Sequence, residues 1–85
     1  MSNFQKGLDN ILTETRRELS ARHMEGASVS YKDRGSALDG AQITVVARGK
    51  TASATFDRID IDDCHQGVSV RVQIEIKRFV GEFER

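Results

Sequence analysis

The densest cluster of candidate ligand side chains in this sequence consists of Asp60, Asp62, Asp63 and His65. Carboxylate oxygens with one imidazole nitrogen could hold a divalent cation, and the cluster starts like a calcium-binding loop. The match then fails, because His65 stands where that loop needs a glycine and Arg71 stands where it needs a bidentate glutamate. We therefore predict a polar loop here, with no bound metal and no cofactor.

Two further arrangements resemble catalytic or phosphate-binding motifs. Cys64 and His65 could act as a nucleophile and its base, but neighbours in an extended chain point to opposite sides, so we expect no hydrogen bond between them. The run from Ala47 to Thr51 ends like a P-loop, yet Thr44 occupies the place of its first glycine and a strand pattern follows. The sequence thus predicts no catalytic residues and favours a protein that is not an enzyme.

The composition limits the chain to one modest domain. Its 85 residues are 38% apolar and 31% charged, which is typical of a single folded domain over residues 1–85 with a small core. The 13 basic residues are balanced by 13 acidic ones, so the basic excess of a strong nucleic-acid binder is missing. No run approaches the roughly 20 apolar residues of a membrane span, and the N-terminal segment is too acidic for a transit peptide. We therefore expect a cytoplasmic protein with no membrane partner.

The elements that would position these residues begin with an amphipathic helix over the first 25 residues. Residues of its buried face recur at spacings of three and four, at Phe4, Leu8, Ile11, Leu12, Thr15 and Leu19. Ser2 and Gln5 have the spacing of a capping box, although Asn3 could cap the helix instead. Gly26 is the expected stop. Gly7 is either tolerated near a frayed helix end, the simpler interpretation, or marks the close approach of another backbone.

The rest of the chain alternates between apolar and polar residues, which is typical of strands. Strands are predicted over 27–32 and 42–47, with a glycine-rich loop from Asp33 to Gly40 between them. Gly49-Lys50 fits a two-residue hairpin turn into a third strand. This turn would pair apolar residues only, with Ala47 opposite Ala52, Val45 opposite Ala54 and Ile43 opposite Phe56.

A fourth strand is predicted from the unbroken alternation of Val68, Val70, Val72, Ile74 and Ile76 with polar residues. Before it, the third strand changes phase near Asp57-Arg58 and so ends or bulges there. The predicted fold class is therefore α+β: one N-terminal amphipathic helix packs on one face of a four-stranded antiparallel sheet, in the order α-β-β-β-β, most simply as a meander.

The second face of this predicted sheet has no helix to cover it. Its residues are polar or small, at Gln42, Thr44, Val46, Ser53, Thr55, Ser69, Arg71, Gln73, Glu75 and Lys77. Such a face is either solvated or an interface, and two aromatic residues near the C-terminus either fold onto the core or act as exposed anchors. Our candidate interface residues are Thr44, Val46, Ser53, Thr55, Arg71, Gln73, Glu75, Lys77, Phe79 and Phe83.

We therefore predict a small non-enzymatic interaction, regulatory or inhibitory module that forms a homodimer, or binds a larger protein, through the open sheet face or an edge strand. One alternative is a nucleic-acid or anion binder that uses Arg48, Lys50, Arg71 and Lys77 on the sheet. Nucleic acid is disfavoured, because the open face offers almost no aromatic rings on which bases could stack. A second alternative is an enzyme or metal binder that works through the loop from Asp60 to His65.

Overall fold

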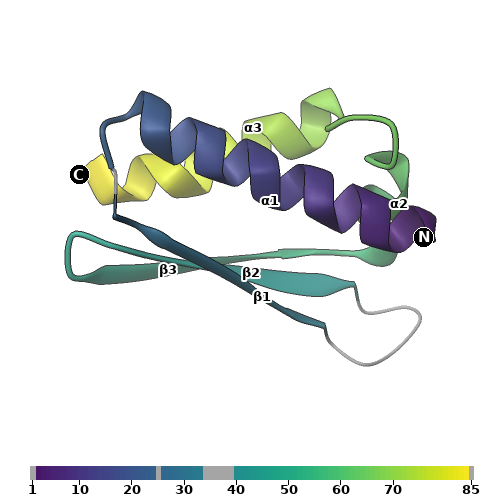
Figure 1. Cartoon of the computed structure of the whole chain (residues 1–85), viewed down its shortest axis with the longest axis horizontal. Coiled ribbons are helices and arrows are strands. Elements are labelled where there is room, and N and C mark those ends of the chain that lie inside the picture. The colour runs from purple at the N-terminus through teal and green to yellow at the C-terminus, as the bar shows by residue number, and fades with distance from the viewer. Residues whose placement is uncertain (1, 25, 34–39, 85) are drawn as a thin grey trace.

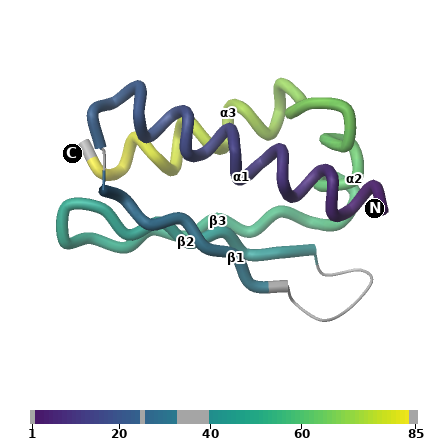
Figure 2. Tube along the Cα trace, in the orientation of Figure 1, coloured from purple at the N-terminus to yellow at the C-terminus, as the bar shows by residue number. Residues whose placement is uncertain are grey.

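A computed structural model of the chain describes residues 2–24, 26–33 and 40–84. Its elements, in chain order, are helix α1 (Asn3–Ala21), strands β1 (Ser28–Asp33), β2 (Ala41–Ala47) and β3 (Lys50–Phe56), helices α2 (Arg58–Asp63) and α3 (Val70–Gly81), and the 3₁₀ turn η1 (Glu82–Glu84). The three strands form an antiparallel sheet in the order β1-β2-β3. Helices α1 and α3 lie together over one face of this sheet, which gives two layers (Figures 1 and 2). The predicted α+β class with an N-terminal helix is confirmed, and the predicted loop from Asp33 to Gly40 lies mostly outside the described residues.

Helix α1 forms as its apolar spacing predicts. The Ser2 hydroxyl accepts a hydrogen bond from the Gln5 amide at 3.2 Å, so Ser2 is the N-cap. All the predicted core residues of this helix except Phe4 are buried, and the Thr15 hydroxyl donates to the Ile11 carbonyl at 2.8 Å. The helix ends at Ala21, before the predicted stop at Gly26.

Gly7 marks a close approach of two backbones, so the simpler interpretation of this glycine is wrong. It is buried, and a Cβ atom added there would lie 1.8 Å from the carbonyl oxygen of Ile61 in α2. Ile61 is itself fully buried. Only a residue without a side chain lets α1 and α2 pack at this distance.

The β2–β3 hairpin has the predicted faces but not the predicted register. The turn is Arg48-Gly49, both with positive φ (52° and 75°), as a type I′ turn requires. Ala47 therefore pairs with Lys50, not with Ala52, and the whole ladder is shifted by two residues, so that Ile43 faces Ala54. A shift of two residues keeps every side chain on its predicted side, because side chains alternate with a period of two.

The predicted fourth strand is wrong, because residues 70–81 form helix α3. Val72 and Ile76 of the alternating run are buried together with Phe79, Val80 and Phe83, at spacings of three and four. Val70 and Ile74 of the run are left outside, 72% and 59% exposed, while Val68, before the helix, packs against the core and is partly buried. The Ser69 hydroxyl accepts a hydrogen bond from the Val72 amide at 3.3 Å and caps the helix.

The phase change near Asp57 is the start of another helix and not a bulge. The Asp57 carboxylate accepts a hydrogen bond from the Asp60 amide at 2.9 Å and caps α2. Ile61 points into the core from this helix while Ile59 is exposed. The short helix also leaves β3 without a following strand, since the chain crosses to the helix layer at this point (Figure 1).

Candidate functional site

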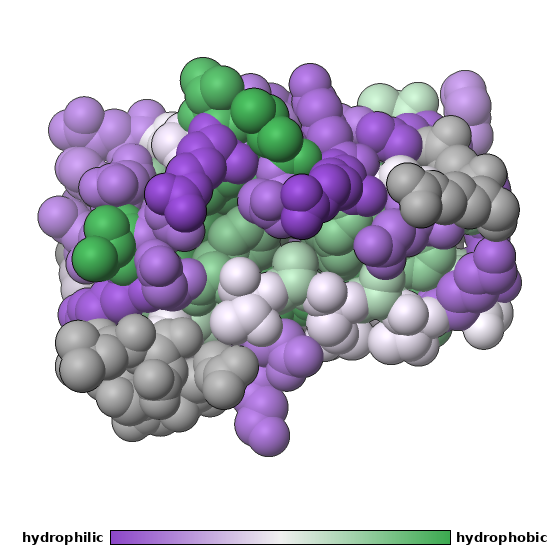
Figure 3. All heavy atoms as spheres, turned by 180° about the vertical axis from the view of Figure 1, so that it is seen from behind, coloured by the Kyte–Doolittle hydropathy of each residue, from purple (hydrophilic) through white to green (hydrophobic). Residues whose placement is uncertain are grey.

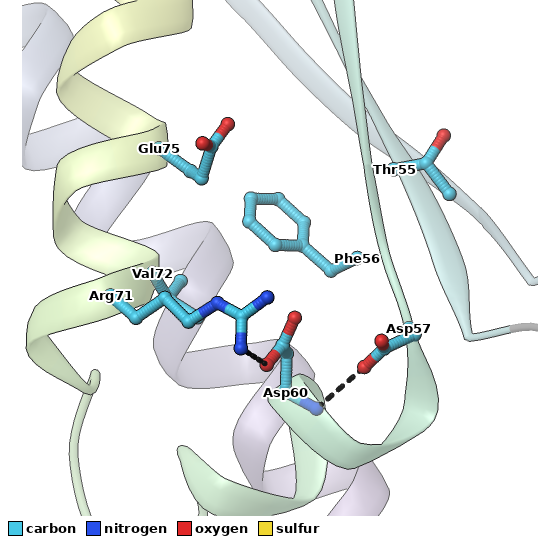
Figure 4. A pocket seen from close by; sticks show the side chains of 7 residues that line it. All are labelled: Thr55, Phe56, Asp57, Asp60, Arg71, Val72 and Glu75. Atoms are coloured by element: carbon cyan, nitrogen blue, oxygen red, sulfur yellow. Dashed lines mark hydrogen bonds and ion pairs between the residues drawn. The ribbon is translucent and has the colours of Figure 1, made fainter.

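A hollow lies between β3 and the start of α3. It has a volume of about 330 Å³ and is lined by Thr55, Phe56, Asp57, Asp60, Arg71, Val72 and Glu75. The Phe56 ring and the Arg71 and Glu75 side chains project into the space between strand and helix, while Thr55 points to the other face of the sheet (Figure 4). Sequence reasoning missed this groove, because it depends on α3 being a helix that lies above β3.

The charges in this groove are three carboxyl groups and one guanidinium. Arg71 Nη1 lies 3.9 Å from Asp60 Oδ1, and the Arg71 side chain is largely exposed. Burial, together with the nearby negative charge of Asp57, raises the pKa of Asp60, and the positive charge of Arg71 opposes this shift. The groove therefore presents both signs of charge around an aromatic floor.

The structure separates the residues that the sequence analysis placed on one open face. Thr44, Val46, Ser53 and Thr55 do lie on the face of the sheet away from the helices, and the Thr44 and Ser53 hydroxyls are 3.1 Å apart. Arg71, Gln73, Glu75 and Lys77 instead belong to α3, so their predicted place on the sheet is wrong. Phe79 and Phe83 are buried in the core, so of their two predicted alternatives the fold onto the core is confirmed and their place among the candidate interface residues is wrong.

The candidate nucleophile and metal-ligand cluster is spread over α2 and the turn after it. Cys64 is fully buried and accepts a hydrogen bond from the Ser69 amide at its Sγ atom, 3.5 Å away. The Asn10 side chain donates to the Cys64 carbonyl at 2.7 Å, and His65 Nδ1 lies 2.9 Å from the Asp62 carbonyl oxygen. Within the described ranges, no three His, Cys, Asp or Glu side chains come close enough to hold one metal ion.

The four basic residues of the anion-binding alternative are not gathered into one patch on the sheet. Arg48 and Lys50 lie at the β2–β3 turn, Arg71 lies at the start of α3, and Lys77 lies on α3, where its carbonyl accepts from Arg22. The hairpin turn also explains the P-loop-like run, since Gly49 supplies the positive φ angle that the turn needs.

A second, more apolar hollow of about 230 Å³ lies where α1 meets β1. It is lined by Arg16, Leu19, Ser20, Met24, Gly26, Ala27 and Val29. Both hollows thus follow an outer strand of the sheet, at the line where the helix layer ends.

Comparison with protein-family models, curated proteins and solved structures finds no match to this chain. Of the helices that the structure describes, none has the length and apolarity needed to cross a membrane.

Proposed function

We propose that this protein is a small interaction module that associates with a second copy of itself through its sheet. The observation that carries the proposal is that α1 and α3 cover the same face (Figure 1), while among the described strands β1 and β3 each pair on one side only. An outer strand offers unpaired backbone N–H and C=O groups, which are a template for pairing with another chain. Self-association is one way for natural proteins to satisfy such an edge.

Three properties of the chain support association with a second copy. The formal net charge is zero, so two copies approach each other without net repulsion. The residues on the open face of β2 and β3 are uncharged, at Gln42, Thr44, Val46, Thr51, Ser53 and Thr55. An 85-residue domain also has a modest core, and burial at an interface would add to its stability.

Sedimentation equilibrium of the purified chain from low micromolar to near-millimolar concentration tests this proposal. We expect the weight-average mass to rise with concentration and to level off at twice the monomer mass. A mass that stays at the monomer value throughout this range would overturn the proposal.

A further inference from the structure

We propose that the interface for the second copy is the outer edge of β3 together with the side of α3 that borders it. This inference rests on the self-association proposed above and assigns it to one surface. We call this surface the β3 flank, and it consists of Ala52, Ser53, Ala54, Arg71, Glu75, Arg78 and Glu82. Its occupant is the β3 flank of the second copy, in antiparallel orientation.

The strand part of the flank is built for close approach. Ala52 and Ala54 face the helix layer and are only half-buried, so the layer above them is not filled on the outer side. From behind, the molecule is hollowed between its helix layer and its sheet, and apolar atoms line the hollow (Figure 3). From Thr51 to Thr55 the strand has neither a proline nor a charged residue, the features with which edge strands usually prevent pairing.

The helix part of the flank is a stripe of alternating charge. Arg71, Glu75, Arg78 and Glu82 are separated by four, three and four residues, which places them along one side of the helix and its 3₁₀ extension. Arg71 and Glu75 line the groove beside Thr55 and Phe56, so this side is the one next to β3. The sequence along the stripe is plus, minus, plus, minus.

An antiparallel copy of this stripe complements it at every position. When two stripes lie side by side in antiparallel orientation, Arg71 faces Glu82 of the other copy and Glu75 faces Arg78 of the other copy. Each of these pairs occurs twice because of the twofold symmetry, and no like charges face each other. The symmetry axis then passes between Ile76 and Lys77.

The strand accommodates the same axis. The start of α3 lies beside Thr55 and Phe56, and η1 at its other end contacts β3, so we place the middle of α3 level with Ser53, the middle residue of β3. A twofold axis at Ser53 pairs Ser53 with itself and Ala52 with Ala54 of the other copy, which joins two three-stranded sheets into one of six strands. The small alanine side chains leave room beneath the two α3 helices.

The opposite flank, where β1 borders α1, carries fewer charges. The hollow there is lined by a single charged residue, Arg16, whereas four charged residues of alternating sign follow the β3 flank along α3 and η1. The charge pattern therefore favours the β3 flank over the β1 edge for a second copy.

Charge substitutions test the stripe by sedimentation equilibrium. Glu75→Arg turns two attractive Arg–Glu contacts into repulsive ones, and we expect the dimer dissociation constant to rise at least about tenfold. The double variant Glu75→Arg, Arg78→Glu restores opposite charges across the axis and should return to within about threefold of the parent chain. Within one chain Glu75 also pairs with Arg78 at i,i+3, with Arg78 Nη2 3.5 Å from Glu75 Oε1. The matched control is therefore Glu14→Arg, which breaks the i,i+3 pair of Glu14 with Arg17 on α1 and should leave the dissociation constant unchanged.

Cysteine cross-linking tests the axis. Two residues that face each other across an antiparallel twofold have Cα atoms about 4.5–5.5 Å apart, within the range of a disulfide. Ser53→Cys should therefore form a disulfide-linked dimer on mild oxidation. Ser30→Cys, in the middle of the other outer strand, should not, and neither should the parent chain, whose only cysteine, Cys64, is buried.

The outcomes separate this inference from the proposed function. A dimer that is insensitive to Glu75→Arg, or that cross-links through Ser30→Cys instead of Ser53→Cys, would overturn the β3 flank and leave self-association standing. A chain that sediments as a monomer at every concentration would overturn both. Far-ultraviolet circular dichroism of each variant confirms that it has the fold of the parent chain before it is compared.

Discussion

The contact between Gly7 and Ile61 gives the sharpest prediction about stability, because a single methyl group would separate two elements. In Gly7→Ala the new Cβ would lie 1.8 Å from the Ile61 carbonyl oxygen, and the next nearest atom is the Ile61 carbonyl carbon at 2.8 Å. Both atoms belong to the backbone of α2, so no side-chain rotation relieves the clash. The two helices must instead move apart by more than 1 Å to restore ordinary contact.

The expected loss of stability combines two opposing effects. Alanine in place of glycine inside a helix contributes up to about 1 kcal/mol in favour of the variant. Overpacking a filled interior costs about 1–3 kcal/mol, and partial exposure of the fully buried Ile61 adds about 1 kcal/mol or more. We therefore expect Gly7→Ala to lower the free energy of unfolding by about 2 kcal/mol. This loss lowers the melting temperature by about 8–16 °C in a domain of this size.

Urea unfolding followed by circular dichroism measures this loss, and Gly81→Ala is the matched control. Gly81 is also helical, but a Cβ there meets only the end of the Arg22 side chain, at 3.3 Å. The control should unfold within about 1 kcal/mol of the parent chain. If Gly7→Ala is as stable as the parent chain or more stable, the close packing of α1 on α2 is refuted.

Three further predictions concern the elements around the groove. Ile76→Ala should lower the free energy of unfolding by about 2–4 kcal/mol, while Ile74→Ala should change it by less than about 0.5 kcal/mol, because Ile76 is buried and Ile74 is exposed. Equal losses in the two variants would favour a strand, in which both side chains lie on one face. Ser69→Ala removes the α3 cap and should lower the free energy of unfolding by about 1 kcal/mol, whereas Ser69→Asp can still cap the helix and should keep most of the parent stability. An unchanged urea midpoint in Ser69→Ala would contradict the cap. Because burial raises the pKa of Asp60 in the folded chain, this residue contributes to the free energy of unfolding below pH 3.8, and the contribution is lost as the pH rises through the raised pKa. The free energy of unfolding of Asp60→Asn should therefore fall less steeply than that of the parent chain over this pH range. Identical pH profiles of the two proteins would refute the pKa shift.

How far the sequence predicts this fold is clearest in α3. Val72 and Ile76 satisfy both a strand period and a helix period, and it is the exposure of Val70 and Ile74 that decides between them. Two apolar β-branched residues on the solvent side of a helix give the same pattern as a strand with one buried face. The continuation through Phe79, Val80 and Phe83 at spacings of three and four was the available signal for a helix.

The candidate site depends on this same decision. While residues 70–76 are taken as a strand, Arg71 and Glu75 fall on a flat polar face with Thr44 and Ser53. As a helix, the segment places them in a stripe with Arg78 and Glu82 beside the edge of β3. The charges themselves were visible in the sequence, but their alignment required the helical period. The faces of β2 and β3 were predictable, because a register shift of two residues preserves them.

Backbone amide hydrogen exchange at low and high protein concentration tests the central claim most directly, because edge pairing must protect specific N–H groups. We predict that alternate amides of β3, those that point away from β2, exchange more slowly as the concentration rises, while the amides of β1 keep their rates. Exchange in β3 that is independent of concentration, or new protection confined to β1, would contradict pairing through the β3 flank.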